Sequence, residues 1–353
     1  MSQKSLRVGL VGCGSIAQQC HLPALHQTKG VEIAALCDVK EDLARDTAGK
    51  FNIKRYYADL AEMLQREELS LVDICTPPRS HATLAIQAME AGCHVVVEKP
   101  IAISCQEADE MIRASEENRV KLYVAHNQLF LPVVAKAMSM ASQGFLGDLT
   151  GANLRDAQRR DNHEFMDQDH WIHKLPGGLF AEHLPYPIYL AMAFLGHLEP
   201  ATVYARKLST YDWVVADEAR VVLESEKGIA TITASHNWPK VTATLDLFGT
   251  KRNLHVNRHS SVLTSYGVGG ESRLWRALEN VSQSYQQLAC TASAAVNTVL
   301  GKRASGHSIL IGKFVQAIRD DGQVPVTGEE GREVVRVLEK ITSQTESVAR
   351  RRT

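Results

Sequence analysis

A glycine-rich turn between a strand and a helix constrains this chain more than any other feature. The apolar run 6–11 predicts a strand, the sequence Gly-Cys-Gly-Ser-Ile-Ala follows at 12–17, and residues 18–26 have a helical pattern. In this spacing Gly12 permits a tight turn, Gly14 lets the main chain approach a pyrophosphate, and Ala17 allows close helix packing. The turn therefore predicts a dinucleotide-binding βαβ unit with its phosphates at the helix N-terminus.

The end of the second predicted strand, residues 31–37, supports this interpretation. Asp38 follows that strand and can accept hydrogen bonds from adenosine ribose hydroxyls. Its charge would repel a 2′-phosphate, which favours NAD over NADP, although Lys40 nearby keeps NADP open as an alternative. Asp38 could also serve as the N-cap of the helix that follows it.

Strands and helices continue to alternate through the first third of the chain. Further strands are predicted at 71–75, 95–97 and 121–125, and helices at 41–51, 60–66, 81–91 and 104–118. Three helices begin with capping residues: Asp59, with Glu62 three residues later, Ser80, and Ser104, with Glu107 three residues later. This alternation implies right-handed crossovers and a doubly wound parallel sheet, which is an α/β fold.

In the sequence His-Val-Val-Val-Glu-Lys-Pro at 94–100, a predicted buried strand is followed directly by two charged residues, Glu98 and Lys99. Pro100 cannot continue a β ladder, so the Lys99 amine is expected at the carboxyl edge of the sheet, where open α/β sheets bind ligands. An isolated lysine after a strand would be interpreted as a surface residue. Here several predicted strands end in residues that could contact a cofactor, and these ends share one edge of the sheet, which favours a binding role for Lys99. The candidate cofactor-binding residues are Gly12, Gly14, Ser15, Ile16, Ala17, Asp38, Thr76, Pro77, His81, Glu98, Lys99 and Asn127.

The pattern changes after residue 126, so we predict a Rossmann domain over 1–126 and an α+β domain over 127–353. Residues 149–169 are polar, and an apolar helical run at 179–195 places Glu182 and Tyr186 on one helical face. Tyr186 could equally be a core aromatic. Apolar or alternating segments at 203–208, 219–224, 229–235, 243–249 and 253–256 predict a mostly antiparallel sheet with one open face.

Three helices are predicted after this sheet. Leu274, Leu278, Val281, Tyr285 and Leu288 recur at three- and four-residue steps, in a helix that could extend to Leu300. This stripe favours packing on the domain or a subunit contact over a membrane anchor. The other two helices are predicted at 308–319 and 329–346.

Composition excludes several classes of partner. The 39 Lys and Arg residues nearly balance the 40 Asp and Glu residues, so no overall field favours nucleic acid or an anionic membrane. No apolar run approaches the roughly 18 residues of a membrane span, and no signal segment is evident, so we expect a cytoplasmic protein. The seven Cys lack zinc and redox spacings. His163, His170 and His173 match no ligand pattern and are expected to be solvated loop residues, so no metal site is predicted.

These motifs resemble the Gfo/Idh/MocA family of sugar and cyclitol oxidoreductases over nearly the whole chain. The carriers are the glycine turn, Thr76-Pro77, Glu98-Lys99-Pro100, the Pro-Gly-Gly turn at 176–178, and Val324-Pro325 followed by Glu330-Gly331-Arg332. The resemblance implies a nicotinamide cofactor, a polyhydroxylated small-molecule substrate, and a homodimer or homotetramer joined through the open sheet. It also implies a cis bond before Pro100.

Two departures from the family pattern bear on catalysis. Glu182 and Tyr186 stand where the family commonly carries Asp and His, and Leu129 replaces an Arg two residues after Asn127. A free tyrosine is a poor base at neutral pH, but a nearby ammonium lowers its pKa. We therefore expect Lys99 to polarise the reacting oxygen, Tyr186 to transfer the proton and Glu182 to position substrate hydroxyls. The alternatives are a non-catalytic NAD-binding sensor and an NAD-assisted glycosidase.

Overall fold

The computed structural model describes residues 5–267, 270, 272–299 and 305–350. It divides the chain into two compact units, Met1–Phe130 with Ser305–Arg336, and Leu131–Ala304 with Val337–Thr353. The sequence-based division instead assigned everything after residue 126 to one domain. The difference arises because residues 305–336 return to the first unit.

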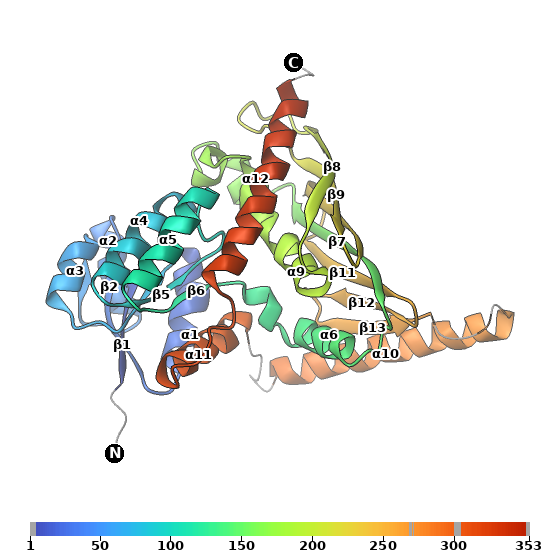
Figure 1. The fold of residues 1–353 in the computed structure, drawn as a ribbon, viewed down its shortest axis with the longest axis horizontal. Helices are drawn as coiled ribbons and strands as arrows, with labels where there is room; N and C mark the ends of the chain where they lie inside the picture. The colour runs from blue at the N-terminus through green and yellow to red at the C-terminus, as the bar shows by residue number, and fades with distance from the viewer. Residues whose placement is uncertain (1–4, 268–269, 271, 300–304, 351–353) are drawn as a thin grey trace. The chain divides into compact units, whose positions relative to one another are not determined.

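The first unit is built on a parallel sheet of six strands in the order β3-β2-β1-β4-β5-β6 (Figure 1). The strands are β1 (Leu6–Val11), β2 (Val31–Cys37), β3 (Tyr56–Tyr57), β4 (Leu71–Ile74), β5 (His94–Val97) and β6 (Leu122–Val124). Strands β4 and β5 are buried almost throughout, as their continuous apolar runs predicted. The predicted doubly wound α/β fold is confirmed.

Helices connect these strands, and their boundaries follow the predicted caps closely. They are η1 (Ala17–His21), α1 (Leu22–Gln27), α2 (Glu41–Lys50), α3 (Leu60–Arg66), η2 (Pro78–Ser80), α4 (His81–Glu90), α5 (Cys105–Glu117) and η3 (Asn127–Phe130). The side chains of Asp59 and Ser104 accept hydrogen bonds from the main-chain N–H groups of Glu62 and Glu107. Ser80 makes no such cap, because its hydroxyl donates to Pro77 O or to Thr76 Oγ1.

The returning segment completes the core of the first unit. In α11 (Gly306–Arg319), Leu310, Ile311 and Phe314 join the cluster formed by the sheet and its helices. The ring of Phe314 lies 4.9 Å from that of Tyr123 on β6, measured between centroids. Helix α12 (Gly328–Arg350) follows and begins within this unit.

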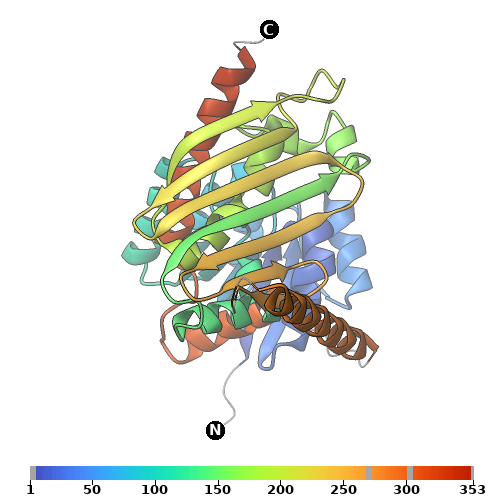
Figure 2. The same ribbon diagram turned by 90° about the vertical axis from the view of Figure 1, so that its right-hand side faces the viewer.

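The second unit contains a seven-stranded sheet in the order β13-β12-β11-β7-β10-β9-β8 (Figure 2). Its strands are β7 (Leu149–Arg159), β8 (Glu199–Arg206), β9 (Glu218–Ser225), β10 (Gly228–Trp238), β11 (Thr242–Gly249), β12 (Asn253–Asn257) and β13 (Val262–Tyr266). All neighbours pair antiparallel except β7 with β10. The predicted, mostly antiparallel sheet is therefore confirmed.

The helices of this unit include one correction to the sequence-based prediction. They are α6 (Pro132–Ser142), α7 (His163–Met166), η4 (Trp171–Lys174), α8 (Leu179–His183), α9 (Pro185–Leu195) and α10 (Arg273–Val299). The apolar run 179–195, predicted as one helix, is divided into α8 and α9 at Leu184, because Pro185 has no N–H to continue the first helix. Leu300, the predicted end of α10, lies outside the described residues.

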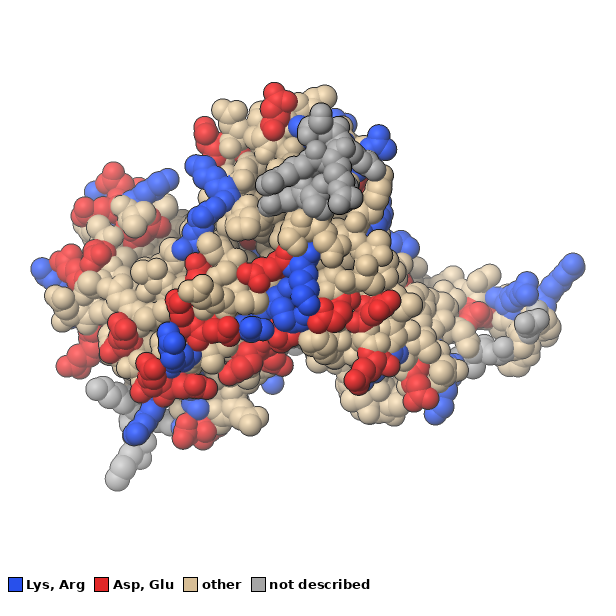
Figure 3. All heavy atoms as spheres, turned by 45° about the horizontal axis from the view of Figure 1, so that its top comes forward, with Lys and Arg blue, Asp and Glu red and all other residues tan. Residues whose placement is uncertain are grey.

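The described part of the chain contains no helix that combines the length and the apolar composition needed to cross a membrane. On the face shown in Figure 3, Lys and Arg side chains are interspersed with Asp and Glu. This mixture agrees with the near-equal numbers of the two charge types in the sequence.

Candidate active site

The glycine turn and the end of β2 are joined by the side chain of Asp38. One carboxylate oxygen accepts a hydrogen bond of 2.8 Å from Cys13 N, and the other accepts one of 2.8 Å from Lys40 N. The N-cap position of α2 is Lys40, so the alternative assignment of Asp38 as that N-cap is wrong. Asp38 instead holds the turn against the second strand, at the edge where a ribose is expected.

The two glycines of the turn have different surroundings. A Cβ built on Gly12, whose φ is +91°, would lie 2.8 Å from Cys75 O, so the turn packs tightly against the end of β4. A Cβ on Gly14 would have no described atom within 4 Å. Space beside Gly14 therefore fits the close approach of a pyrophosphate, and Ser15 is exposed next to it while Ala17 is buried.

His81 connects the turn after β4 with the turn after β5. Its Nδ1 lies 2.9 Å from Pro100 O and its Nε2 lies 2.7 Å from Thr76 O. The ring is completely buried, and this burial lowers the pKa of His81. Among the predicted cofactor residues, His81 thus ties together the Thr76 and Pro100 turns.

The Glu98-Lys99-Pro100 segment follows β5 directly. Glu98 and Lys99 are both buried, with 7% and 4% of their surface exposed. The bond between Lys99 and Pro100 is cis, as the resemblance implied. Glu98 Oε2 accepts a hydrogen bond of 3.0 Å from Lys99 N, so the carboxylate fixes the main chain at the lysine.

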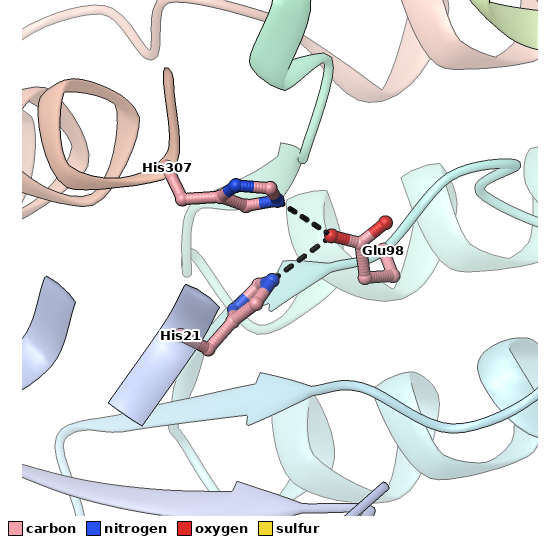
Figure 4. A group of neighbouring side chains, drawn as sticks. All are labelled: His21, Glu98 and His307. Atoms are coloured by element: carbon pink, nitrogen blue, oxygen red, sulfur yellow. Dashed lines mark hydrogen bonds and ion pairs between the residues drawn. The ribbon is translucent and has the colours of Figure 1, made fainter. Parts of the chain in front are cut away.

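Two histidines converge on the carboxylate of Glu98 (Figure 4). Nε2 of His21, at the end of η1, lies 2.9 Å from Glu98 Oε1, and Nε2 of His307, at the start of α11, lies 3.4 Å from it. On its other side, His21 Nδ1 lies 2.9 Å from a carboxylate oxygen of Asp73, within β4. His307 Nδ1 lies 3.4 Å from Asn127 Nδ2, so the network reaches the end of β6.

This arrangement determines the charge of its members. Although burial alone would lower the pKa of His21, the Asp73 carboxylate raises it well above the usual range. Burial would likewise raise the pKa of Glu98, but hydrogen bonds from His21 and His307 hold it well below its usual range. The network therefore contains an imidazolium between two carboxylates.

The same side chains are close enough for a metal ion to join them. A ring nitrogen of His21, a ring nitrogen of His307 and a carboxylate oxygen of Glu98 lie within 4.8 Å of one another, and His21 forms a second such group with Asp73 and Cys75. Both ring nitrogens of His21, however, face carboxylate oxygens, so both are hydrogen-bond donors when the ring is protonated. We interpret the group as a hydrogen-bond network.

Sequence reasoning missed His21, Asp73 and His307. A signal was present at Asp73, because a carboxylate inside a strand buried on both faces requires a cationic or donating partner. The partners could not be identified, since His21 is 52 residues and His307 is 234 residues away in the sequence.

The remaining candidates belong to the second unit, whereas Lys99 belongs to the first. Glu182 lies on α8 and Tyr186 on α9, and the Tyr186 ring is 6.0 Å from that of Tyr189. His163 is exposed, whereas His170 and His173 are half-buried and each bury one ring nitrogen, so these two are less solvated than expected.

Comparisons with known proteins identify the same protein family for segments of both units. Residues 6–126 match the "Oxidoreductase family, NAD-binding Rossmann fold" and residues 134–255 match the "GFO/IDH/MocA C-terminal domain". The chain is 35% identical over 144 residues to D-apiose dehydrogenase of Paraburkholderia graminis, which is 41% of this chain and 38% of that protein. It is 29% identical over 160 residues to D-glucoside 3-dehydrogenase of Escherichia coli, covering 45% of each.

These matches span less than half the length of either curated relative. Among solved structures, the WlbA dehydrogenase of Bordetella pertussis, in complex with NADH and UDP-GlcNAcA, aligns with a TM-score of 0.82 at 19% identity. That alignment covers 100% of this chain and 98% of the other. At this identity the likeness concerns the fold.

Proposed function

Because the chain belongs to the Gfo/Idh/MocA oxidoreductase family, with its NAD-binding Rossmann fold, we propose that it is an NAD-dependent dehydrogenase or reductase. Its reaction would move a hydride between nicotinamide and the CH–OH or carbonyl carbon of a sugar, cyclitol or sugar derivative. The observation that carries this proposal is the buried Lys99 at the carboxyl edge of the sheet, on a main chain fixed by Glu98.

The first unit suits a dinucleotide at this edge. The open space at Gly14 would take the pyrophosphate, and the Asp38 carboxylate would accept hydrogen bonds from the ribose. The same carboxylate would repel a 2′-phosphate, so we propose NAD as the preferred cofactor, with NADP as the weaker alternative. Bound nicotinamide would supply the hydride acceptor or donor.

The chain's own residues would manage the proton and the substrate. Lys99 donates a hydrogen bond to the reacting oxygen and stabilises the negative charge that develops there. Tyr186 takes the hydroxyl proton during oxidation and returns it during reduction. Glu182 accepts hydrogen bonds from substrate hydroxyls, and Asn127, whose Nδ2 lies 3.4 Å from His307 Nδ1, contributes a polar group after β6.

The names of the relatives support the substrate class. D-apiose dehydrogenase and D-glucoside 3-dehydrogenase are named for sugar substrates, and the WlbA dehydrogenase was crystallised with a nucleotide sugar. We propose a polyhydroxylated substrate on this basis. Arg155, Arg159 and Arg160 could hold a phosphate or a nucleotide-sugar diphosphate. They are exposed on or next to β7, however, and Arg159 pairs with Asp161, so we favour surface roles for them.

Two further proposals concern assembly and location. We propose a homodimer or homotetramer joined through the second unit's sheet, whose strands alternate buried and accessible residues. We also propose a cytoplasmic location, which is supported by seven cysteines that all have free thiols.

The direct test is absorbance at 340 nm with NAD or NADP and a panel of sugars, cyclitols and nucleotide sugars. With an active substrate, Lys99→Met should reduce kcat by roughly 10²- to 10⁴-fold, while the Kd for NAD changes little. The exposed Lys54 provides the control, because Lys54→Met removes a charge from the same unit without touching this edge. Turnover that survives Lys99→Met would refute the assignment.

The same assay separates the alternatives. A sensor would bind NAD and sugar without any change at 340 nm. An NAD-assisted glycosidase would release free sugar from a glycoside without net formation of NADH.

A further inference from the structure

Helix α10, Arg273–Val299, has its polar side against its own domain and its apolar side toward solvent. None of its described residues is buried. Its least exposed positions are Glu279, Gln283, Gln286, Cys290 and Ala294, which recur at three- and four-residue steps and so form one face. This arrangement is the reverse of an ordinary surface helix, which buries its apolar stripe.

The polar face of α10 is bonded to β13, the edge strand of the second unit's sheet. Gln286 Oε1 accepts a hydrogen bond of 2.8 Å from Ser265 N, and Gln286 Nε2 donates one of 3.3 Å to Ser265 O. Glu279 accepts a hydrogen bond from Gly267 N, and Cys290 Sγ donates to Leu263 O at 3.5 Å. These bonds satisfy main-chain groups of an otherwise open edge and fix the rotation of α10 about its axis.

The opposite face is apolar and exposed. Leu274, Leu278, Val281, Tyr285, Leu288 and Val299 are between 49% and 86% exposed. With Ala292 and Ala295 between the last two, the steps are four, three, four, three, four, three and four residues. We call these eight residues the α10 stripe. Their spacing is that of a coiled-coil seam, repeated over more than three heptads.

We propose that the α10 stripe packs against the α10 stripe of a second copy of this chain. A sustained 3.5-residue repeat fits another helix, because that period keeps two supercoiled helices in register along their length. The positions beside the stripe, such as Ser284 and Thr291, are uncharged, so two copies would meet without like-charge repulsion. This proposal does not depend on the proposed catalytic activity.

The direction of α10 suits such a contact. In Figure 1 the helix extends past the sheet of its own unit, and Figure 2 looks onto the open face of that sheet with α10 projecting toward the viewer. A second copy facing this sheet would meet the projecting helix. The helix interface would therefore be continuous with the sheet interface that the family resemblance implies.

The composition of α10 favours a protein partner over a membrane. Helices that lie on membranes carry Lys and Arg along a polar face turned to water, whereas the polar face of α10 is bonded to β13. Its charged residues, Arg273, Arg276 and Glu279, all lie in its first two turns, so residues 280–299 carry no charge. Ala292 and Ala295 add little lipid affinity but allow close helix approach.

The test measures dimer dissociation by sedimentation equilibrium of the full-length protein. Leu278→Ser combined with Leu288→Ser should raise the dissociation constant roughly a hundredfold or more, because each dimer loses four buried leucines. Asn280→Ser combined with Gln287→Ser is the matched control, since both residues are exposed on α10 outside the stripe. Unchanged helix content by circular dichroism would show that both variants fold.

Two results would overturn the proposal. One is a wild-type protein that stays monomeric at tens of micromolar, or that dimerises as tightly in the stripe variant as in the control. The other is stripe-dependent binding of the monomer to phosphatidylcholine and phosphatidylglycerol vesicles, which would identify a membrane as the occupant.

Discussion

At the scale of single residues, the carboxylate of Asp73 explains much of the candidate site. It lies in β4 with no exposed surface, and its burial is balanced by His21 Nδ1 at 2.9 Å, with the Cys75 thiol as a weaker donor at 3.6 Å. The sequence predicted Glu98 and Lys99 at the sheet edge because strand ends are recognisable from local composition. The partners His21 and His307 could not be predicted, because these residues meet the carboxylates only once η1, β4 and α11 are packed together.

Replacing His21 with Gln should destabilise the protein by about 3–5 kcal/mol, since two buried carboxylates would lose their shared cation. The measurement is urea unfolding monitored by circular dichroism at pH 6. His26→Gln is the control, because His26 is exposed near the end of α1. Equal stability of the two variants would show that the network contributes nothing to folding.

The shifted pKa values of His21 and Glu98 also predict how the stability of the wild-type protein depends on pH. The pKa of His21 is raised in the folded state, so its contribution is complete below about pH 6.5 and declines as the pH rises through the raised value. The pKa of Glu98 is lowered, so its contribution is lost only as the pH falls well below 4.5. Wild-type stability should therefore decrease more from pH 6 to pH 9 than that of His21→Gln, and parallel curves would contradict this.

Gly14 allows a test of cofactor binding that leaves the fold intact. A Cβ at this position meets no described atom, so Gly14→Ala should change the unfolding midpoint little while weakening NAD binding at least tenfold by calorimetry. Gly12→Ala should instead destabilise the protein, because its Cβ would contact the main chain of Cys75. Unaltered NAD affinity in Gly14→Ala would place the pyrophosphate elsewhere.

At the scale of elements, local chemistry predicted the longer helices of the first unit and missed one central strand of the second. Strand β7 contains Gly151, Asn153 and Asp156, residues that are rare in strands, and it was read as a polar segment. Its conformation comes from pairing with β10 and β11 on either side, and Asp156 is balanced by Arg258 at 3.0 Å. The strand propensity of its residues therefore did not predict β7, because pairing with two neighbouring strands determines its conformation.

A predicted cap can be tested at the same scale. Asp59→Ala should cost about 1 kcal/mol of stability, because the N–H of Glu62 loses its acceptor at the start of α3. Asp59→Asn should be nearly neutral, since asparagine caps equally well. Equal losses in both variants by urea unfolding would point to the charge of Asp59 rather than to the cap.

At the scale of the whole chain, the first unit is discontinuous, which local patterns could not reveal. The match to the NAD-binding Rossmann family covers residues 6–126 in one region, yet the core also contains Leu310, Ile311 and Phe314 from α11. The apolar period of a sequence predicts a helix, but it does not indicate the domain against which that helix packs. The assignment of 305–336 to the first unit follows only from packing.

This discontinuity predicts opposite behaviour for two truncated chains. A chain ending at Ala304 lacks α11, so Tyr123 loses its contact with Phe314 and Glu98 loses its contact with His307. A chain ending at Arg336 keeps every segment of the first unit and removes only residues assigned to the second. We expect the longer chain to bind NAD by calorimetry and the shorter one to lose binding, together with part of its helical circular dichroism. If both chains bound NAD equally, residues 305–336 would be dispensable for the cofactor site, and the continuous domain 1–126 expected from the sequence would be the functional one.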